Sequence, residues 1–138
     1  MNQLAYLCLL TGTVSICCLN ATTATQAQII SDGTVSTEVN TSDNRNYAIN
    51  GGTQAGGNLF HSFRDFSVPD KGSVVFNNAA SVKNIISRVT GRSISNIDGS
   101  IGAKGIANLF LLNPNGIIFG RNASLKIGGS FLATTASR

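Results

Sequence analysis

The chain has 138 residues and a mass of 14.3 kDa, which is enough for one small domain. Charged residues make up only 12% of it, about half the usual share of a soluble domain, and the net charge of +4 is too small to indicate a class of partner. A single His and a single Glu argue against His-rich metal sites and paired-glutamate hydrolases, while 15 glycines indicate many turns.

The first segment, residues 1–27, is predicted to be a secretory signal peptide. No charged residue precedes Asp32, and Leu4–Leu19 is mostly apolar but shorter than the roughly 20 residues that span a bilayer. Thr25-Gln26-Ala27 places small residues at the −3 and −1 positions, so cleavage is expected after Ala27. The segment lacks the usual N-terminal Lys or Arg, and the alternative is a buried hydrophobic helix. A lipidated Cys17 is disfavoured because Ile16 precedes it.

The cysteines at positions 8, 17 and 18 all lie within this segment. Residues 28–138 therefore contain neither a disulfide framework nor a cysteine-based metal site. We expect an exported chain that is held together by packing and backbone hydrogen bonds.

The chain after the signal segment is predicted to be all-β. Val35, Thr37, Val39 and Thr41 alternate with polar residues, as in a half-buried strand. Short apolar runs follow at Val74–Phe76, Ile85–Ile86, Ile94–Ile97, Leu109–Leu112, Ile117–Phe119, Leu125–Ile127 and Phe131–Ala133. Gly, Asn and Asp, which accept left-handed backbone conformations, separate these runs. No window after Gln28 sustains a helical period.

The spacing of the runs favours a parallel β-helix, that is, a solenoid of stacked coils. Phe131 lies 21 positions after Phe110, and Val89 lies 21 positions before Phe110. Three short strands in each circuit of roughly 20 residues would pair with their equivalents in the next circuit. Apolar residues would stack inside, and a stacked Asn would bond its equivalent one circuit away. A β-sandwich or barrel is the alternative.

Three stretches carry a resemblance to a known family: residues 58–68 (NLFHSFRDFSV), 72–78 (GSVVFNN) and 107–120 (ANLFLLNPNGIIFG). In this order they resemble the secretion domain of filamentous haemagglutinin-like exoproteins, the N-terminal two-partner secretion (haemagglutination activity) domain. The resemblance covers about Ile29 to Ala136, so residues 28–138 would be the secretion domain behind the signal peptide.

The resemblance implies a right-handed β-helix that is secreted or held at the cell surface of a diderm bacterium. The chain would cross the periplasm extended, and an outer-membrane β-barrel transporter with periplasmic recognition domains would recognise it. Outside the cell it would nucleate folding of an adhesin-like exoprotein. The family's domain is usually longer and precedes a passenger, so we expect a truncated product or fragment that ends with an unpaired sheet edge. Any carbohydrate binding would belong to that passenger.

Two groups of residues are the candidates for partner recognition or for β-helix corners. Asn113-Pro114-Asn115-Gly116 is a tight turn in which Pro fixes φ and Asn-Gly supplies positive φ values. Ile117 follows this turn, and Asn77-Asn78 ends an apolar run in the same way. The sequence leaves open whether these positions serve the corners alone or also the partner.

His61, Ser62 and Asp65 contain the residue types of a catalytic triad, but they are too close in sequence and lack a nucleophile elbow. We expect His61 to be a turn or rim histidine beside Phe60 and Phe63.

The glycine-containing segments also have structural interpretations. Gly102–Gly105 lacks the spacing of a phosphate loop and is expected to be a corner. Gly51-Gly52 and Gly56-Gly57 are expected to form a flexible loop. Basic residues are scattered, with Arg88 and Arg92 the only close pair, which disfavours nucleic-acid binding.

The sequence thus predicts a non-enzymatic secretion-signal domain with no cofactor and no membrane span after signal cleavage. One alternative is a surface adhesin that binds carbohydrate or a host protein directly, although exposed aromatics suited to sugars are few. A β-helix hydrolase is the other alternative, but the few acidic residues of this chain are far apart in sequence.

Overall fold

The computed structural model describes residues 28–137, and these residues are all-β, as predicted. The strands are β1 (Ile29–Ser31), β2 (Thr37–Thr41), β3 (Asn46–Gly51), β4 (Thr53–Ala55), β5 (Asn58–Phe66), β6 (Ser73–Phe76), β7 (Asn84–Val89), β8 (Ser95–Ile97), β9 (Ser100–Ala103), β10 (Asn108–Leu112), β11 (Ile117–Phe119), β12 (Ser124–Lys126) and β13 (Phe131–Thr134). Within this range no helix is long and apolar enough to cross a membrane.

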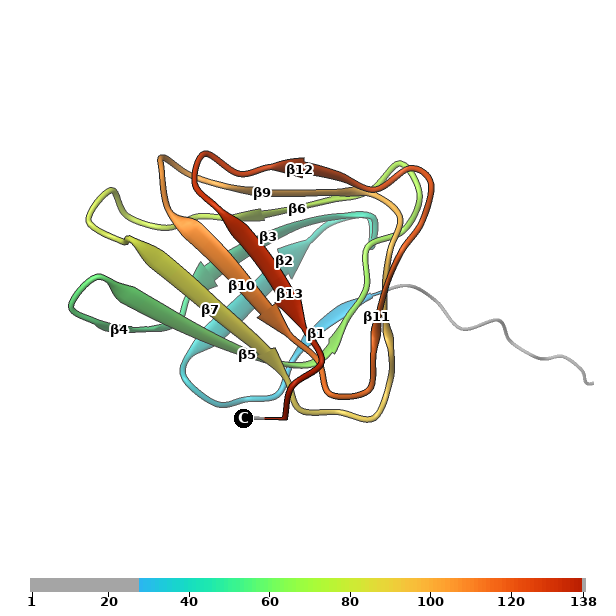
Figure 1. The fold of residues 1–138 in the computed structure, drawn as a ribbon, viewed down its shortest axis with the longest axis horizontal. Coiled ribbons are helices and arrows are strands. Elements are labelled where there is room, and N and C mark those ends of the chain that lie inside the picture. The colour runs from blue at the N-terminus through green and yellow to red at the C-terminus, as the bar shows by residue number, and fades with distance from the viewer. Residues whose placement is uncertain (1–27, 138) are drawn as a thin grey trace, which may run out of the picture.

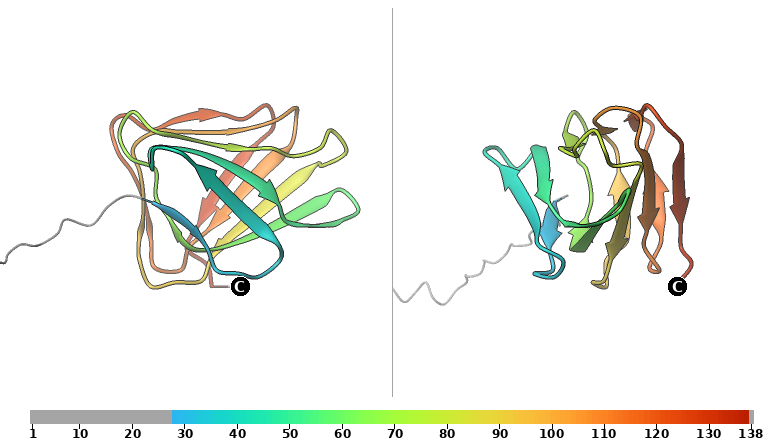
Figure 2. Two further views of the ribbon diagram at one scale, coloured as in Figure 1. Left: turned by 180° about the vertical axis from the view of Figure 1, so that it is seen from behind. Right: turned by 90° about the vertical axis from the view of Figure 1, so that its left-hand side faces the viewer.

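The strands wind into a right-handed solenoid whose three sheets form the sides of a triangle (Figure 1). The six-stranded sheet has the order β1-β5-β7-β10-β13, with β4 also paired to β5. The five-stranded sheet has the order β12-β9-β6-β3-β2, and β11 and β8 form the third sheet. Strands of successive coils pair in parallel, and Figure 2 shows the coils side by side along the axis. The predicted parallel β-helix is therefore confirmed.

The coils are longer than the predicted circuit of roughly 20 residues. Equivalent inward residues pair in register: Leu59 with Ile85, Ile85 with Leu109, and Leu109 with Phe131. These pairs are 26, 24 and 22 residues apart. The expected equivalence of Val89, Phe110 and Phe131 is wrong. Val89 pairs with Phe63, Phe110 pairs with Ile86 and Leu132, and Phe131 pairs with Leu109. The lengths differ because the loops between strands absorb the additional residues.

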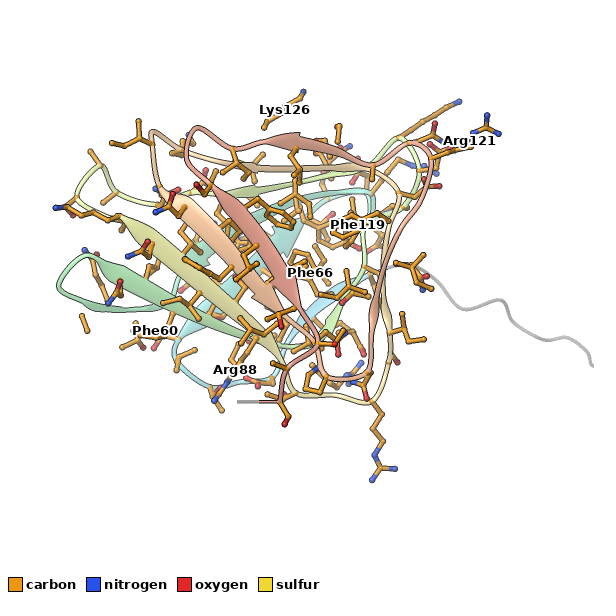
Figure 3. The ribbon with its side chains drawn as sticks, viewed as in Figure 1. Phe60, Phe66, Arg88, Phe119, Arg121 and Lys126 are labelled. Carbon is orange, nitrogen blue, oxygen red and sulfur yellow. The ribbon has the colours of Figure 1, made fainter. Side chains whose placement is uncertain are left out.

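The solenoid interior is a stack of apolar side chains supplied by alternate residues of the strands. An aromatic cluster fills the end nearest the N-terminus, where the ring centroids of Phe63 and Phe66 are 5.0 Å apart and those of Phe66 and Phe76 are 6.3 Å apart. All three side chains are buried. Figure 3 shows Phe66 inside the solenoid, whereas Arg121 and Lys126 point away from it.

Antiparallel strands close the N-terminal end of the solenoid. β1 pairs with β5, and β2 pairs with β3, so both exposed edges of the first coil are covered. The predicted strand from Val35 is partly wrong. Val35 and Ser36 form a turn with φ of 46° and 56°, and the strand begins at Thr37.

The segment predicted to be a flexible loop is instead a β-hairpin. Thr53–Ala55 forms β4 and pairs with the start of β5, Thr53 opposite Phe60 and Ala55 opposite Asn58. Gly56, with φ of +62°, supplies the left-handed residue that a two-residue hairpin turn needs.

Candidate recognition corners

The two predicted groups of site residues lie at different corners of the triangle. Asn77-Asn78 follows β6, in the loop that leads to β7, and Asn113–Gly116 joins β10 to β11. In Figure 1 the first loop lies at the left and the second at the lower right. The structure therefore does not bring these residues together into one site.

Asn113 is the centre of the second corner, and its side chain is 0% exposed. Its Nδ2 donates to Ser93 O (3.0 Å) and to Ser95 Oγ (2.9 Å), both in the preceding coil. Its Oδ1 accepts hydrogen bonds from Asn115 N and Asn115 Nδ2, each at 2.9 Å. The amide uses both donors and its acceptor, so Asn113 links the turn to the coil beneath it.

The rest of this corner is a turn that presents Pro114 and Asn115 to solvent. The N–H of Gly116 donates to Asn113 O (3.0 Å), and Asn115 Nδ2 reaches Gly91 O of the preceding coil (2.8 Å). Gly116 has the predicted positive φ, at +127°, but Asn115 does not, which corrects the expectation for that residue. Ile117 opens β11 and packs against the core.

The first corner also connects neighbouring coils through asparagine amides. Asn77 Nδ2 donates to Asn50 Oδ1 (2.9 Å). Asn78 forms a reciprocal pair with Lys104 one coil later: its Nδ2 donates to Lys104 O (3.0 Å) and its Oδ1 accepts from Lys104 N (2.9 Å). Lys104 lies in the turn after β9, so Gly102–Gly105 is partly strand and partly corner.

The predicted amide ladder exists at positions that sequence reasoning did not single out. Asn84 Nδ2 donates to Asn58 Oδ1 and Asn108 Nδ2 donates to Asn84 Oδ1, each at 2.9 Å, and Ser130 N donates to Asn108 Oδ1 (2.7 Å). The ladder crosses the starts of β5, β7 and β10. A repeated Asn-apolar-apolar tripeptide marks these starts in the sequence and could have identified them.

The prediction that His61 lies in a turn or at the rim is wrong, because its side chain is buried at 2% exposure in β5. Its ring packs 5.5 Å from the ring of Phe76, and its Nδ1 is hydrogen-bonded to Thr37 Oγ1 (3.2 Å). Burial lowers the pKa of His61 from 6.5 to about 4. The imidazole is therefore neutral near pH 7 and belongs to the core.

The three residues that resemble a triad diverge in space. Ser62 points to the face opposite His61, as neighbours in a strand do, and its Oγ donates to Asp32 Oδ2 (2.5 Å). Asp65 forms an ion pair with the adjacent Arg64, with an Nε to Oδ2 distance of 3.0 Å. These groups do not form a charge-relay arrangement.

Asp32 ties the N-terminal strand to the first two coils. Its Oδ2 accepts from Ser62 and from Thr90 Oγ1 (2.8 Å), and its Oδ1 accepts from Thr34 Oγ1 (2.6 Å). Partial burial alone would raise the pKa of Asp32, but hydrogen bonds from Ser62, Thr34 and Thr90 outweigh it and hold the pKa well below its usual range. Arg88 Nε donates to the same Ser62 hydroxyl (2.9 Å).

The described residues were also considered as ligands for a metal ion or cofactor. Within residues 28–137, no group of three or more His, Cys, Asp or Glu side chains is placed to hold a metal ion. A shallow, mostly apolar hollow lies on the outer face of the six-stranded sheet, lined by Asn58, Asn84, Ile86, Phe110 and Leu112.

Comparisons with known proteins show which family this chain resembles. The family model of the TPS secretion domain matches residues 27–138. The heme/hemopexin-binding protein of Haemophilus influenzae is 36% identical over 70 residues, which are 51% of this chain and 6% of that protein. The crystal structure of a filamentous hemagglutinin secretion domain is 26% identical with a TM-score of 0.66, and the match covers 80% of this chain and 43% of that one.

The chain thus spans less than half of the solved secretion domain and a small part of the curated relative. The family model, in contrast, covers nearly all the residues that the structure describes. The solved domain shares the solenoid fold. The chain therefore belongs to the family of TPS secretion domains and has a role in two-partner secretion.

Proposed function

We propose that residues 28–138 act as the secretion signal that an outer-membrane β-barrel transporter recognises through its periplasmic domains. Residues 1–27 would be the signal peptide, removed after Ala27 at the inner membrane; they lie outside the described residues. The domain would then nucleate β-helix folding of an exported exoprotein, which is secreted or stays at the cell surface. The domain performs no catalysis in this proposal and needs no cofactor.

The observation that carries the folding part of the proposal is the Asn113 side chain. Its bonds to Ser93 and Ser95 form only when the turn after β10 has packed on the preceding coil. A buried amide of this kind is costly when unpaired and stabilising when fully bonded. It therefore couples the closing of one coil to the presence of the previous one, which favours folding coil by coil.

The exposed part of the same corner allows the recognition part of the proposal to be tested without disturbing the core. Pro114 and Asn115 are exposed, whereas Asn113 is buried, so the corner separates into an inner structural residue and an outer accessible one. Asn77 at the other corner is also exposed. The side chains of Asn115 and Asn77 also bond to neighbouring coils, whereas Pro114 has no side-chain hydrogen bond to lose. Substitution of Pro114 can therefore distinguish loss of recognition from loss of folding.

The test is secretion of the full chain from a diderm host with and without a candidate barrel. We expect a barrel-dependent product in the medium whose intact mass places its first residue at Gln28. A cleaved product that stays in the periplasm, beside a barrel that exports a longer relative in parallel, would contradict the proposal.

Three variants separate the two roles. Asn113→Ala should abolish both export and folding. Pro114→Ala should reduce export while lowering the urea midpoint of the purified chain only slightly, by the conformational freedom that the unfolded chain gains. Asn122→Ala is the matched control, because Asn122 is exposed and its side chain makes no hydrogen bond within residues 28–137. If Pro114→Ala is exported like the control, this corner is structural only.

A further inference from the structure

The outer turn of the second corner contains a pair of residues with chemistry of its own, Asn115-Gly116. In an Asn-Gly pair the glycine nitrogen has no neighbouring Cβ to shield it, so it can attack the asparagine side-chain amide of a flexible chain. Asn50-Gly51 is the second such pair in residues 28–137. The two pairs differ in the hydrogen bonds that the asparagine side chain makes in the folded protein.

The folded corner holds both groups that would react. The nucleophile, the Gly116 nitrogen, has its N–H bonded to Asn113 O (3.0 Å). The leaving group, Asn115 Nδ2, donates to Gly91 O (2.8 Å) and to Asn113 Oδ1 (2.9 Å). Attack requires the side-chain carbon to turn toward the Gly116 nitrogen, and this movement would break both bonds of the amide. The folded state therefore protects Asn115.

We propose that Asn115-Gly116 is a self-modification site that limits how long the chain can remain unfolded and still fold. In the unfolded chain the Gly116 nitrogen loses its proton to solvent and bonds to Asn115 Cγ. The Cγ–Nδ2 bond breaks, and ammonia leaves with a proton. Water then adds to one of the two carbonyls of the cyclic imide and opens it, giving aspartate or isoaspartate at position 115.

The modified chain cannot rebuild the corner. A carboxylate at position 115 has no proton to donate, yet it would face two acceptors, Gly91 O and Asn113 Oδ1. The isoaspartate product also inserts a backbone carbon into the turn, which moves the Gly116 N–H away from Asn113 O. Either product removes the contact of Asn115 with Gly91 of the preceding coil, so the only side-chain bonds that the turn keeps to that coil are those of Asn113 to Ser93 and Ser95.

The second pair is an internal control. Asn50 Oδ1 accepts a hydrogen bond from Asn77 Nδ2 (2.9 Å), and an aspartate at position 50 keeps that acceptor. Asn50 Nδ2 makes no hydrogen bond within residues 28–137. The same amide-to-acid change is therefore disruptive at position 115, whereas at position 50 it keeps the hydrogen bond and adds only repulsion from the exposed carboxylate of Glu38, which lies opposite Asn50 across β2 and β3.

The consequence for export rests on the proposed function and on the expectation, from the family resemblance, that the chain crosses the periplasm extended. A chain that waits too long for its transporter would lose the corner and fail to fold outside. The chemistry itself needs no transporter, so its failure and a failure of the export proposal are distinguishable.

The first experiment incubates the full chain, folded in buffer or unfolded in urea, at the same mildly alkaline pH, and maps deamidation at both pairs by peptide mass spectrometry. We expect position 115 to react at least about tenfold faster in the unfolded chain, because the folded chain must open first. After transfer to buffer, peptides modified at 115 should be depleted from the folded fraction. Equal rates in the two states would overturn the proposal.

Two variants test the carboxylate alone. Asn115→Asp should shift the unfolding equilibrium in urea toward the unfolded state by at least about tenfold, the effect of losing its two side-chain hydrogen bonds. Asn50→Asp should shift it by less than about threefold, since its single bond persists. An Asn115→Asp chain as stable as the wild type would refute the site, whatever the export assay gives.

Discussion

Replacing Asn84 by Ala should destabilise the domain more than its partly exposed position suggests. Asn84 is the middle rung of the amide ladder: it donates to Asn58 Oδ1 and accepts from Asn108 Nδ2, each at 2.9 Å. Each lost hydrogen bond costs about 1 kcal/mol, and the partly buried partners that remain unpaired add to this. We expect a loss of about 2–3 kcal/mol in the free energy of unfolding, the sum of these contributions.

The loss is measured by urea denaturation followed by far-ultraviolet circular dichroism. With a denaturant slope typical of small domains, the midpoint should fall by about 1 M or more. Asn96→Ala is the matched control, because Asn96 is an exposed strand asparagine whose side chain makes no hydrogen bond within residues 28–137. If the two variants lose the same stability, the ladder contributes nothing beyond the loss of an asparagine from a strand, and the reasoning fails.

Two further predictions concern the buried residues of β5. Because the pKa of His61 is lowered from 6.5 to about 4 on folding, the unfolded chain binds a proton first, and stability should fall as the pH drops from 6.5 to 4, by roughly 3 kcal/mol in total. His61→Gln should remove this pH dependence of stability in urea melts. If the pH dependence is unchanged, it comes from another titrating group and the reasoning fails. Phe63→Ala should cost about 3–5 kcal/mol because Phe63 is 0% exposed in the aromatic cluster, whereas Phe60→Ala, at 36% exposure, should cost about 1 kcal/mol. Similar midpoints for these two variants in thermal unfolding would contradict the core assignment.

The apolar runs predicted most of the strands correctly because a coil of this fold is local in sequence. Val74–Phe76, Leu109–Leu112 and Ile117–Phe119 are each a strand or most of one. The Gly, Asn and Asp residues that separate these runs are the residues that a corner needs. The strands, the turns and the solenoid could therefore be predicted from one pattern. The Asn113–Gly116 turn was identified for the same reason.

The register in which strands of successive coils pair could not be predicted from the sequence. Coils of 26, 24 and 22 residues share no fixed repeat, so the spacing of 21 led to the wrong partner for Val89. The antiparallel pairing at the N-terminal end was also missed, although the strand at Thr37–Thr41 was predicted, because this pairing depends on the need to cover an open edge and not on a local signal.

Local patterns in the sequence establish that this chain is all-β, favour stacked coils, and place asparagine and glycine at the corners. The pairing of the coils, in contrast, puts His61 inside, aligns Asn58, Asn84 and Asn108 in a ladder, and buries Asn113 while Asn115 stays exposed. Strand alternation defines two faces without saying which one is inward. That choice is made by pairing with residues about one coil away, which local patterns do not contain.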